Sequence, residues 1–140
     1  MSDPIRSDPY SALGSAPAPA SIVNTANLVY ALHSLGVAIG VLGAATIVGS
    51  FLFGIPSIVA VVINYVRRPE ARGTFVESHF RWQIRTFWFT LLWVSVCTAL
   101  ALTILGIPVA LVGFGFLTLW VIYRIARGWL RLREGVGMYQ

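Results

Sequence analysis

The chain has 140 residues, of which 57% are hydrophobic and only 11% are charged, and its formal net charge is +5. An average soluble domain contains about 25% charged and about 45–50% apolar residues. The composition therefore excludes an ordinary soluble domain, because too few charged side chains are present to cover an apolar core. We expect most of the apolar surface to face lipid.

Residues 1–21 are rich in Pro, Ser and Ala and show no periodic apolar pattern, which predicts a disordered tail. They do not resemble a secretory signal peptide, because Asp3, Asp8 and the prolines stand where a basic region and an apolar core should be. We expect the first apolar segment after them to act as an uncleaved insertion signal.

Charged residues are absent from two long stretches, 9–66 and 86–123. A helix rises 1.5 Å per residue, so a hydrocarbon core of about 30 Å requires roughly 20 residues. Each apolar stretch is therefore long enough for two spans. We predict an all-α protein, an integral membrane four-helix bundle over residues 22–132 with a short C-terminal tail at 133–140. The predicted spans are about residues 28–48, 51–66, 84–105 and 107–124.

The sequence predicts one position for the turn of the second hairpin and two alternatives for the turn of the first. In the second hairpin, Gly106-Ile107-Pro108 predicts the reversal, because Gly permits a tight turn and Pro cannot continue the helical ladder. In the first hairpin, the reversal is expected at Gly49-Ser50 or at Gly54-Ile55-Pro56. The second segment is short, so it either spans a thinned bilayer or is re-entrant.

The first two spans contain small and polar residues of interest. Gly36, Gly40 and Gly43 form a small-residue strip that predicts close helix packing, within the chain or in a homodimer. His33 and Asn64 are the expected buried polar side chains. For His33 the alternatives are a hydrogen-bonded structural role and a ligand or gate.

Residues 67–85 carry a cluster of charges between the two hairpins. Thr74 and Glu77 fit a capping box, in which the Thr hydroxyl accepts the N–H of residue 77 and the Glu carboxylate accepts the N–H of residue 74. Glu77, Arg81 and Arg85 share one helical face, and aromatic residues occupy much of the remainder. We therefore predict an interfacial amphipathic helix at about 74–84, leading into the third span. His79 and Gln83 lie off the charged face, and this pattern does not explain them.

The charged residues also predict topology and partners. Four spans place both termini and the central charges on one side, and the positive-inside rule assigns that side to the cytoplasm. Arg124, Arg127 and Arg131 follow the last span on one helical face, where each is expected to attract anionic lipid by about 1 kcal/mol. Nucleic-acid binding is disfavoured, because the arginines lie at membrane edges. The predicted lipid or partner docking residues are Arg67, Arg68, Glu77, Arg81, Trp82, Arg85, Arg124, Arg127 and Arg131.

Motifs for catalysis are absent from the sequence. Neither apolar stretch contains a charged residue, and no nucleophile elbow or metal-ligand spacing surrounds Ser78 and His79. The single cysteine, Cys97, is expected to be a packing residue. We therefore predict a non-enzymatic protein with no catalytic, cofactor-binding or metal-binding residues.

The segments 63–68, 77–88 and 122–130, with His79-Phe80-Arg81-Trp82-Gln83-Ile84-Arg85 at their centre, resemble a group of small bacterial membrane proteins. That group is distantly similar to the protein-import component of the chloroplast inner envelope. The resemblance covers roughly residues 28–132. It implies four membrane helices and a bacterial inner membrane, but no activity and no catalytic residues.

Two functional hypotheses follow from the sequence. The first is an inner-membrane protein that acts by helix packing, as a homo-oligomer or as an accessory of a membrane complex, with the Arg and aromatic residues docking a partner or lipid. The alternative is an oligomeric channel, transporter or translocation component, whose path would be lined by His33, Asn64 and Thr98.

Overall fold

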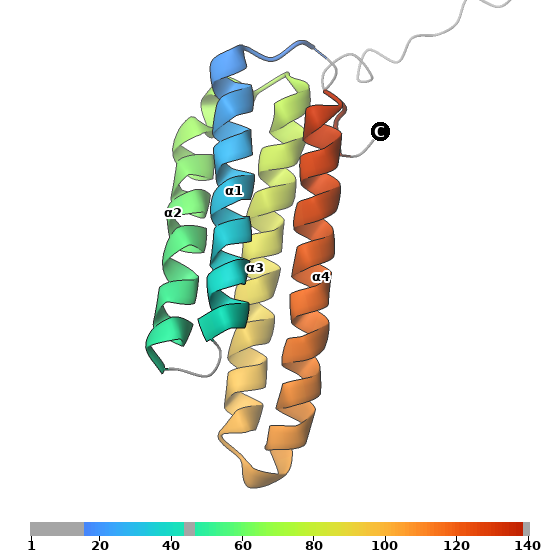
Figure 1. Cartoon of the computed structure of the whole chain (residues 1–140). Coiled ribbons are helices and arrows are strands. Elements are labelled where there is room, and N and C mark those ends of the chain that lie inside the picture. The colour runs from blue at the N-terminus through green and yellow to red at the C-terminus, as the bar shows by residue number, and fades with distance from the viewer. Residues whose placement is uncertain (1–15, 44–46, 139–140) are drawn as a thin grey trace, which may run out of the picture.

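The computed structural model describes residues 16–43 and 47–138, which form four long α-helices. These are α1 (Ala20–Gly43), α2 (Ile47–Ala71), α3 (Phe75–Ala101) and α4 (Ile107–Arg133), with a short 3-10 turn, η1 (Ile104–Gly106), before α4. The four helices lie side by side and run alternately up and down (Figure 1). The all-helical prediction is confirmed for the described residues.

The two ends of the bundle differ in composition. The start of α1, the connection between α2 and α3 and the end of α4 lie together at one end (Figure 1). We call this the polar end, because Arg72 lies in that connection and Arg133 ends α4. Residues 102–106 form the opposite end, which we call the apolar end.

Three of the helices are long and apolar enough to cross a membrane, namely Ala20–Leu42, Phe75–Ala101 and Ile104–Arg133. The structure adds detail at both ends of the described chain. α1 begins at Ala20, inside the segment predicted as a tail, whose residues 1–15 lie outside the described part of the chain. At the other end, Met138 of the predicted C-terminal tail is buried, so this part of the tail packs onto the bundle.

Both predicted positions for the first reversal are wrong. Gly49-Ser50 and Gly54-Ile55-Pro56 lie inside α2, which begins at Ile47 and continues through Pro56 and Pro69 to Ala71. A proline within a helix removes one backbone hydrogen bond but leaves the others in place. In an apolar environment the remaining bonds favour continuation, because an interrupted helix would leave backbone groups without water.

α3 is one continuous helix, so the predicted interfacial helix and third span are not separated by a break. The helix begins after Thr74 as predicted, but the capping bonds differ. The Thr74 hydroxyl donates to the Ala71 carbonyl (2.8 Å), and Glu77 Oε2 accepts the backbone N–H of Gly73 (3.0 Å). The Thr74 N–H is already donated to Ala71 O, which leaves the Gly73 N–H for Glu77.

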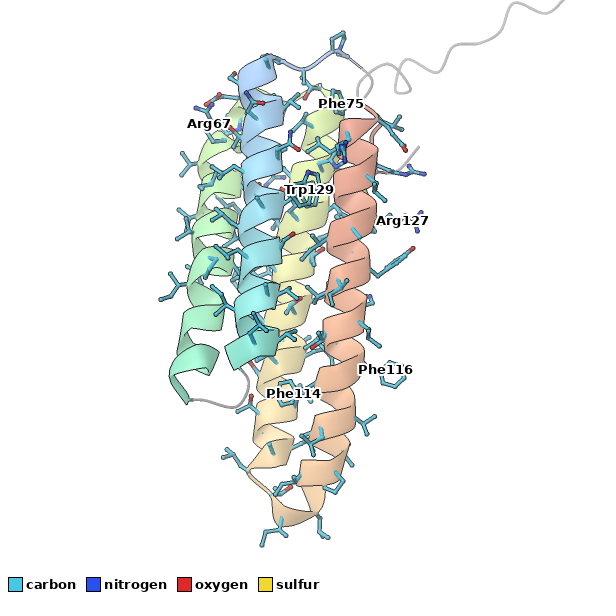
Figure 2. The ribbon with its side chains drawn as sticks, viewed as in Figure 1. Arg67, Phe75, Phe114, Phe116, Arg127 and Trp129 are labelled. Carbon is cyan, nitrogen blue, oxygen red and sulfur yellow. The ribbon has the colours of Figure 1, made fainter. Side chains whose placement is uncertain are left out.

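Close packing is concentrated in the half of the bundle nearest the polar end. In contrast, Leu102, Ile104 and Leu105 at the apolar end are 84%, 88% and 91% exposed. Figure 2 shows Phe75 near the polar end and Phe114 and Phe116 towards the apolar end. The main hydrophobic core consists of Ile22, Ala26, Tyr30, Ala71, Val76, Phe80, Val121, Ile125 and Leu132.

Candidate interhelical polar site

Six polar side chains from three helices meet inside the half of the bundle nearest the polar end. All except Arg124 are classed as buried, and Arg124 is half-buried. They come from α1, α3 and α4, so any interaction among them joins helices that are distant in sequence. We call this group the interhelical polar cluster, and its members are Tyr30, His33, His79, Gln83, Thr86 and Arg124.

His79 connects three parts of the chain and is completely buried. Its Nε2 lies 2.8 Å from the carbonyl oxygen of Val136, and its Nδ1 lies 3.0 Å from the hydroxyl of Tyr30. Because a carbonyl oxygen can only accept, Nε2 carries the proton and Nδ1 of the neutral ring accepts from Tyr30. Nearby, Ser78 Oγ accepts the backbone N–H of Met138 (3.0 Å). These bonds hold the residues after α4 against the start of α3.

Tyr30 reaches α4 because a glycine stands opposite its ring. A Cβ atom at Gly128 would lie 2.3 Å from the Tyr30 hydroxyl oxygen, closer than atoms can approach. The Tyr30 ring is stacked on Trp129 with 6.5 Å between ring centroids, and Trp129 Nε1 donates to Asn27 Oδ1 (3.0 Å). Gly128 therefore allows α1 and α4 to approach each other closely.

Gln83 is one helical turn after His79 and is 2% exposed. Its Nε2 donates to the backbone carbonyl of Ala26 at 3.3 Å, which connects α3 to α1. This bond uses a carbonyl that also belongs to the α1 helix, and carbonyl oxygens have two lone pairs with which to accept.

Arg124 is directed towards α3. Its Nε donates to Thr86 Oγ1 (2.7 Å), and its guanidinium carbon lies 3.5 Å from the centroid of the Trp82 ring and 4.9 Å from that of Trp120. In return, Trp82 Nε1 donates to the Arg124 carbonyl (3.2 Å). The guanidinium thus combines a hydrogen bond with cation–π contacts and fastens α4 to α3.

The three arginines predicted to share a face have different surroundings. Arg127 is exposed, lies near Tyr123 and points away from the bundle (Figure 2). Arg131 donates to the Gly137 carbonyl at 3.1 Å. Arg127 therefore contacts a side chain of its own helix, whereas Arg124 contacts α3 and Arg131 contacts the residues after α4.

The other predicted docking residues lie near the polar end. Arg68, Arg81 and Arg85 are exposed, whereas Arg67 and Trp82 are half-buried. Figure 2 shows Arg67 near the polar end of α2. Arg67 pairs with Glu70 and Arg81 with Glu77, each at 3.1 Å.

The residues predicted to pack against other helices lie on α1 and α3. Gly36 is buried and Gly40 is half-buried, which favours packing within the chain, and Gly43 is the last residue of α1. Cys97 is buried, and a Cβ atom at Gly113 would lie 2.8 Å from its Sγ, which agrees with a packing role.

The three residues suggested to line a conducting path come from three different helices and differ in burial. His33 is buried with its Nδ1 3.0 Å from the Val29 carbonyl. Asn64 is completely buried on α2, and neither atom of its amide has a hydrogen-bond partner among the described residues. Thr98 is exposed and donates to the Val94 carbonyl of its own helix.

The charged-face pattern missed His79 and Gln83 as connecting residues. A signal was nevertheless present: His79, Gln83 and Thr86 are spaced four and three residues apart, which places them on one helical face. All three are buried. A second polar face on an otherwise apolar helix predicts contacts with neighbouring helices rather than with lipid.

Within the described residues, no group of three His, Cys, Asp or Glu side chains is arranged to hold a metal ion. Comparison of the chain with family models, with curated proteins and with solved structures found no match. The resemblance to the bacterial membrane group therefore stays a prediction. What the cluster does is join α1, α3, α4 and the residues after α4.

Proposed function

We propose that the chain is a non-enzymatic, four-span inner-membrane protein whose polar end binds anionic lipid headgroups on the cytoplasmic side. One observation carries this proposal. The arginines of the described residues lie in the half of the bundle nearest the polar end, while the apolar end exposes leucine and isoleucine. Such a distribution suits one end in the headgroup layer and the other end across the hydrocarbon core.

The fourth span of the proposal is α2. Its residues 47–66 contain no charged side chain, and at 1.5 Å per residue they extend about 30 Å, the thickness of a hydrocarbon core. With four spans, the start of α1 and the end of α4 lie on the same side. The positive-inside rule then favours the cytoplasm for the arginine-rich side.

An aromatic pair supports the proposed depth. Trp88 Nε1 donates to the Tyr65 hydroxyl (3.1 Å), and these side chains are 53% and 46% exposed. They lie on neighbouring helices, between the arginines and the apolar end. Exposed Trp and Tyr side chains are typical of the boundary between headgroups and hydrocarbon.

Lipid binding is proposed to use the exposed arginines, with Arg68, Arg81 and Arg85 as the central group. Glu70 and Glu77 reduce the positive charge locally but do not cancel it, since the described chain has nine arginines and three glutamates. Each arginine near an anionic surface contributes about 1 kcal/mol of attraction.

Thiol accessibility tests the proposed topology. In a Cys97→Ala background, single cysteines are introduced by Arg72→Cys at the polar end and by Leu105→Cys at the apolar end. We expect a membrane-impermeant thiol reagent to label the second variant in intact spheroplasts and the first only after permeabilisation. Labelling of both from the outside, or of the first alone, would contradict the proposal.

Lipid enrichment tests the proposed binding. The purified full chain is placed in nanodiscs of mixed phosphatidylglycerol and phosphatidylethanolamine, and the lipids retained on detergent extraction are quantified. We expect phosphatidylglycerol to be enriched around the unaltered chain, less so around an Arg81→Gln/Arg85→Gln variant, and fully around the matched Arg81→Lys/Arg85→Lys variant. Equal enrichment around all three would remove these arginines from the lipid site. A co-purification from native membranes covers the other outcome. If a protein binds the unaltered chain but not the Gln variant, and lipid enrichment is unchanged, these arginines are assigned to partner docking.

A further inference from the structure

A small cavity lies among α1, α3 and α4, inside the interhelical polar cluster. Its lining includes His33 and Tyr30 from α1, Gln83 and Thr86 from α3, and Ile125 from α4. It offers about 10 Å³ to the centre of a water molecule. Roughly this volume is needed to hold one water molecule, and a larger solute does not fit.

Two of the side chains that line the cavity have an atom without a partner. His33 Nε2 and Gln83 Oε1 are buried and make no hydrogen bond to any described residue. The two residues are 5% and 2% exposed, so solvent outside the bundle does not reach them freely. A buried polar atom of this kind is strongly disfavoured unless it finds a partner.

The partners that these residues already have define both atoms as acceptors. His33 Nδ1 lies 3.0 Å from the Val29 carbonyl, which can only accept, so Nδ1 carries the proton and Nε2 of the neutral ring has a lone pair. Gln83 Nε2 donates to the Ala26 carbonyl, which identifies the other amide atom as the carbonyl oxygen. Two acceptors cannot bond to each other, so the pair requires a molecule with two donor hydrogens.

We propose that this cavity binds one water molecule, which donates one hydrogen to His33 Nε2 and the other to Gln83 Oε1. The Tyr30 hydroxyl hydrogen is already donated to His79 Nδ1 and the Thr86 hydroxyl hydrogen to the Trp82 carbonyl, so the water is held through its own two hydrogens. The water links α1 to α3 one or two turns deeper than the direct Gln83–Ala26 bond. It is a structural site for water and is independent of lipid binding at the surface.

Nuclear magnetic resonance of the full chain in lipid bilayers, with ¹⁵N-labelled histidine and an ammonium-free buffer, tests this proposal. We expect a His33 ring that is protonated at Nδ1 and unprotonated at Nε2, with a persistent cross-peak between its ring hydrogens and water. The ammonium-free buffer assigns the cross-peak to water, since an ammonium ion of similar size also has several donor hydrogens.

A matched pair of variants identifies the second anchor. Gln83→Met removes the amide at similar side-chain length and should abolish the water cross-peak. Ser34→Ala is the control, because Ser34 bonds only to the Tyr30 carbonyl of its own helix and does not line the cavity. It should leave the cross-peak unchanged. If the Met variant does not fold, the unaltered chain still decides: a protonated Nε2, which could not accept a hydrogen from the water, or the lack of a water cross-peak would overturn the proposal.

Discussion

The halves of the bundle nearest the polar end and nearest the apolar end use their polar side chains differently. Near the polar end, His79, Gln83 and Arg124 bond to other helices or to the residues after α4. Nearer the apolar end, Ser95 and Thr98 donate to carbonyls four residues earlier in their own helix. Hydrogen bonds between helices specify which helices are neighbours, whereas bonds within a helix satisfy the hydroxyl without choosing a neighbour. The residues that determine the helix arrangement are therefore concentrated near the polar end.

The largest expected effect comes from His79→Ala, which removes the bonds to Tyr30 of α1 and to Val136 after α4 and creates a cavity in the core. We expect the free energy of unfolding to fall by about 3–5 kcal/mol. Reversible unfolding in mixed detergent micelles, followed by circular dichroism, measures the change. Ser95→Ala is the comparison from the other half and should cost less than about 0.5 kcal/mol. Equal losses in the two variants would contradict the difference between the halves.

A second prediction concerns the close approach of α1 and α4. Gly128→Ala should destabilise the chain by about 1–3 kcal/mol, because the new methyl group would displace the buried Tyr30 ring. Gly115→Ala on the same helix is the matched control, since nothing lies within 4 Å of its Cβ position. That control should be neutral or slightly stabilising, because Ala favours a helix over Gly. The same unfolding assay should separate the two variants, and a stable Gly128→Ala protein would show that Tyr30 can move at little cost.

A third prediction separates two arginines of the same helix. Arg124→Lys keeps the positive charge but loses the planar contact with Trp82 and the bond from Nε to Thr86, so we expect a loss of about 1–2 kcal/mol. Arg127→Lys, at an exposed position, should change the free energy of unfolding by less than about 0.5 kcal/mol. Thermal unfolding of both variants at several salt concentrations would measure this, and indistinguishable midpoints would refute the separate roles.

The smallest expected effect is that of Arg81→Gln on stability. The Arg81–Glu77 pair is solvent-accessible, with the Arg81 side chain 56% exposed, and pairs of this kind contribute about 0–1 kcal/mol. We therefore expect near-normal unfolding from Arg81→Gln, which is one of the two substitutions in the Gln variant of the lipid experiment. A large loss of stability would mean that Arg81 supports the fold rather than a surface site.

The sequence contains strong local signals for the helices and weak ones for their contacts. Uncharged stretches predict long helices because charge is costly in hydrocarbon, and a helix start after Thr74 follows from local capping residues. Gly and Pro predict the first reversal at the wrong place, because α2 continues through Pro56. The partners of His79 are Tyr30 and Val136, 49 and 57 residues away, and helical periodicity carries no information about which distant residue faces a given side chain.

The bond between His79 and Val136 also orders events during synthesis. Residue 136 is added 57 residues after residue 79, which takes several seconds at about 5–20 residues per second. During that interval the residues of α1, α2 and α3 are already present, but His79 lacks one partner and Tyr30 lacks the surface formed by Gly128. The first three helices therefore lack these contacts until α4 and the residues after it are added. Those contacts complete the half of the bundle nearest the polar end.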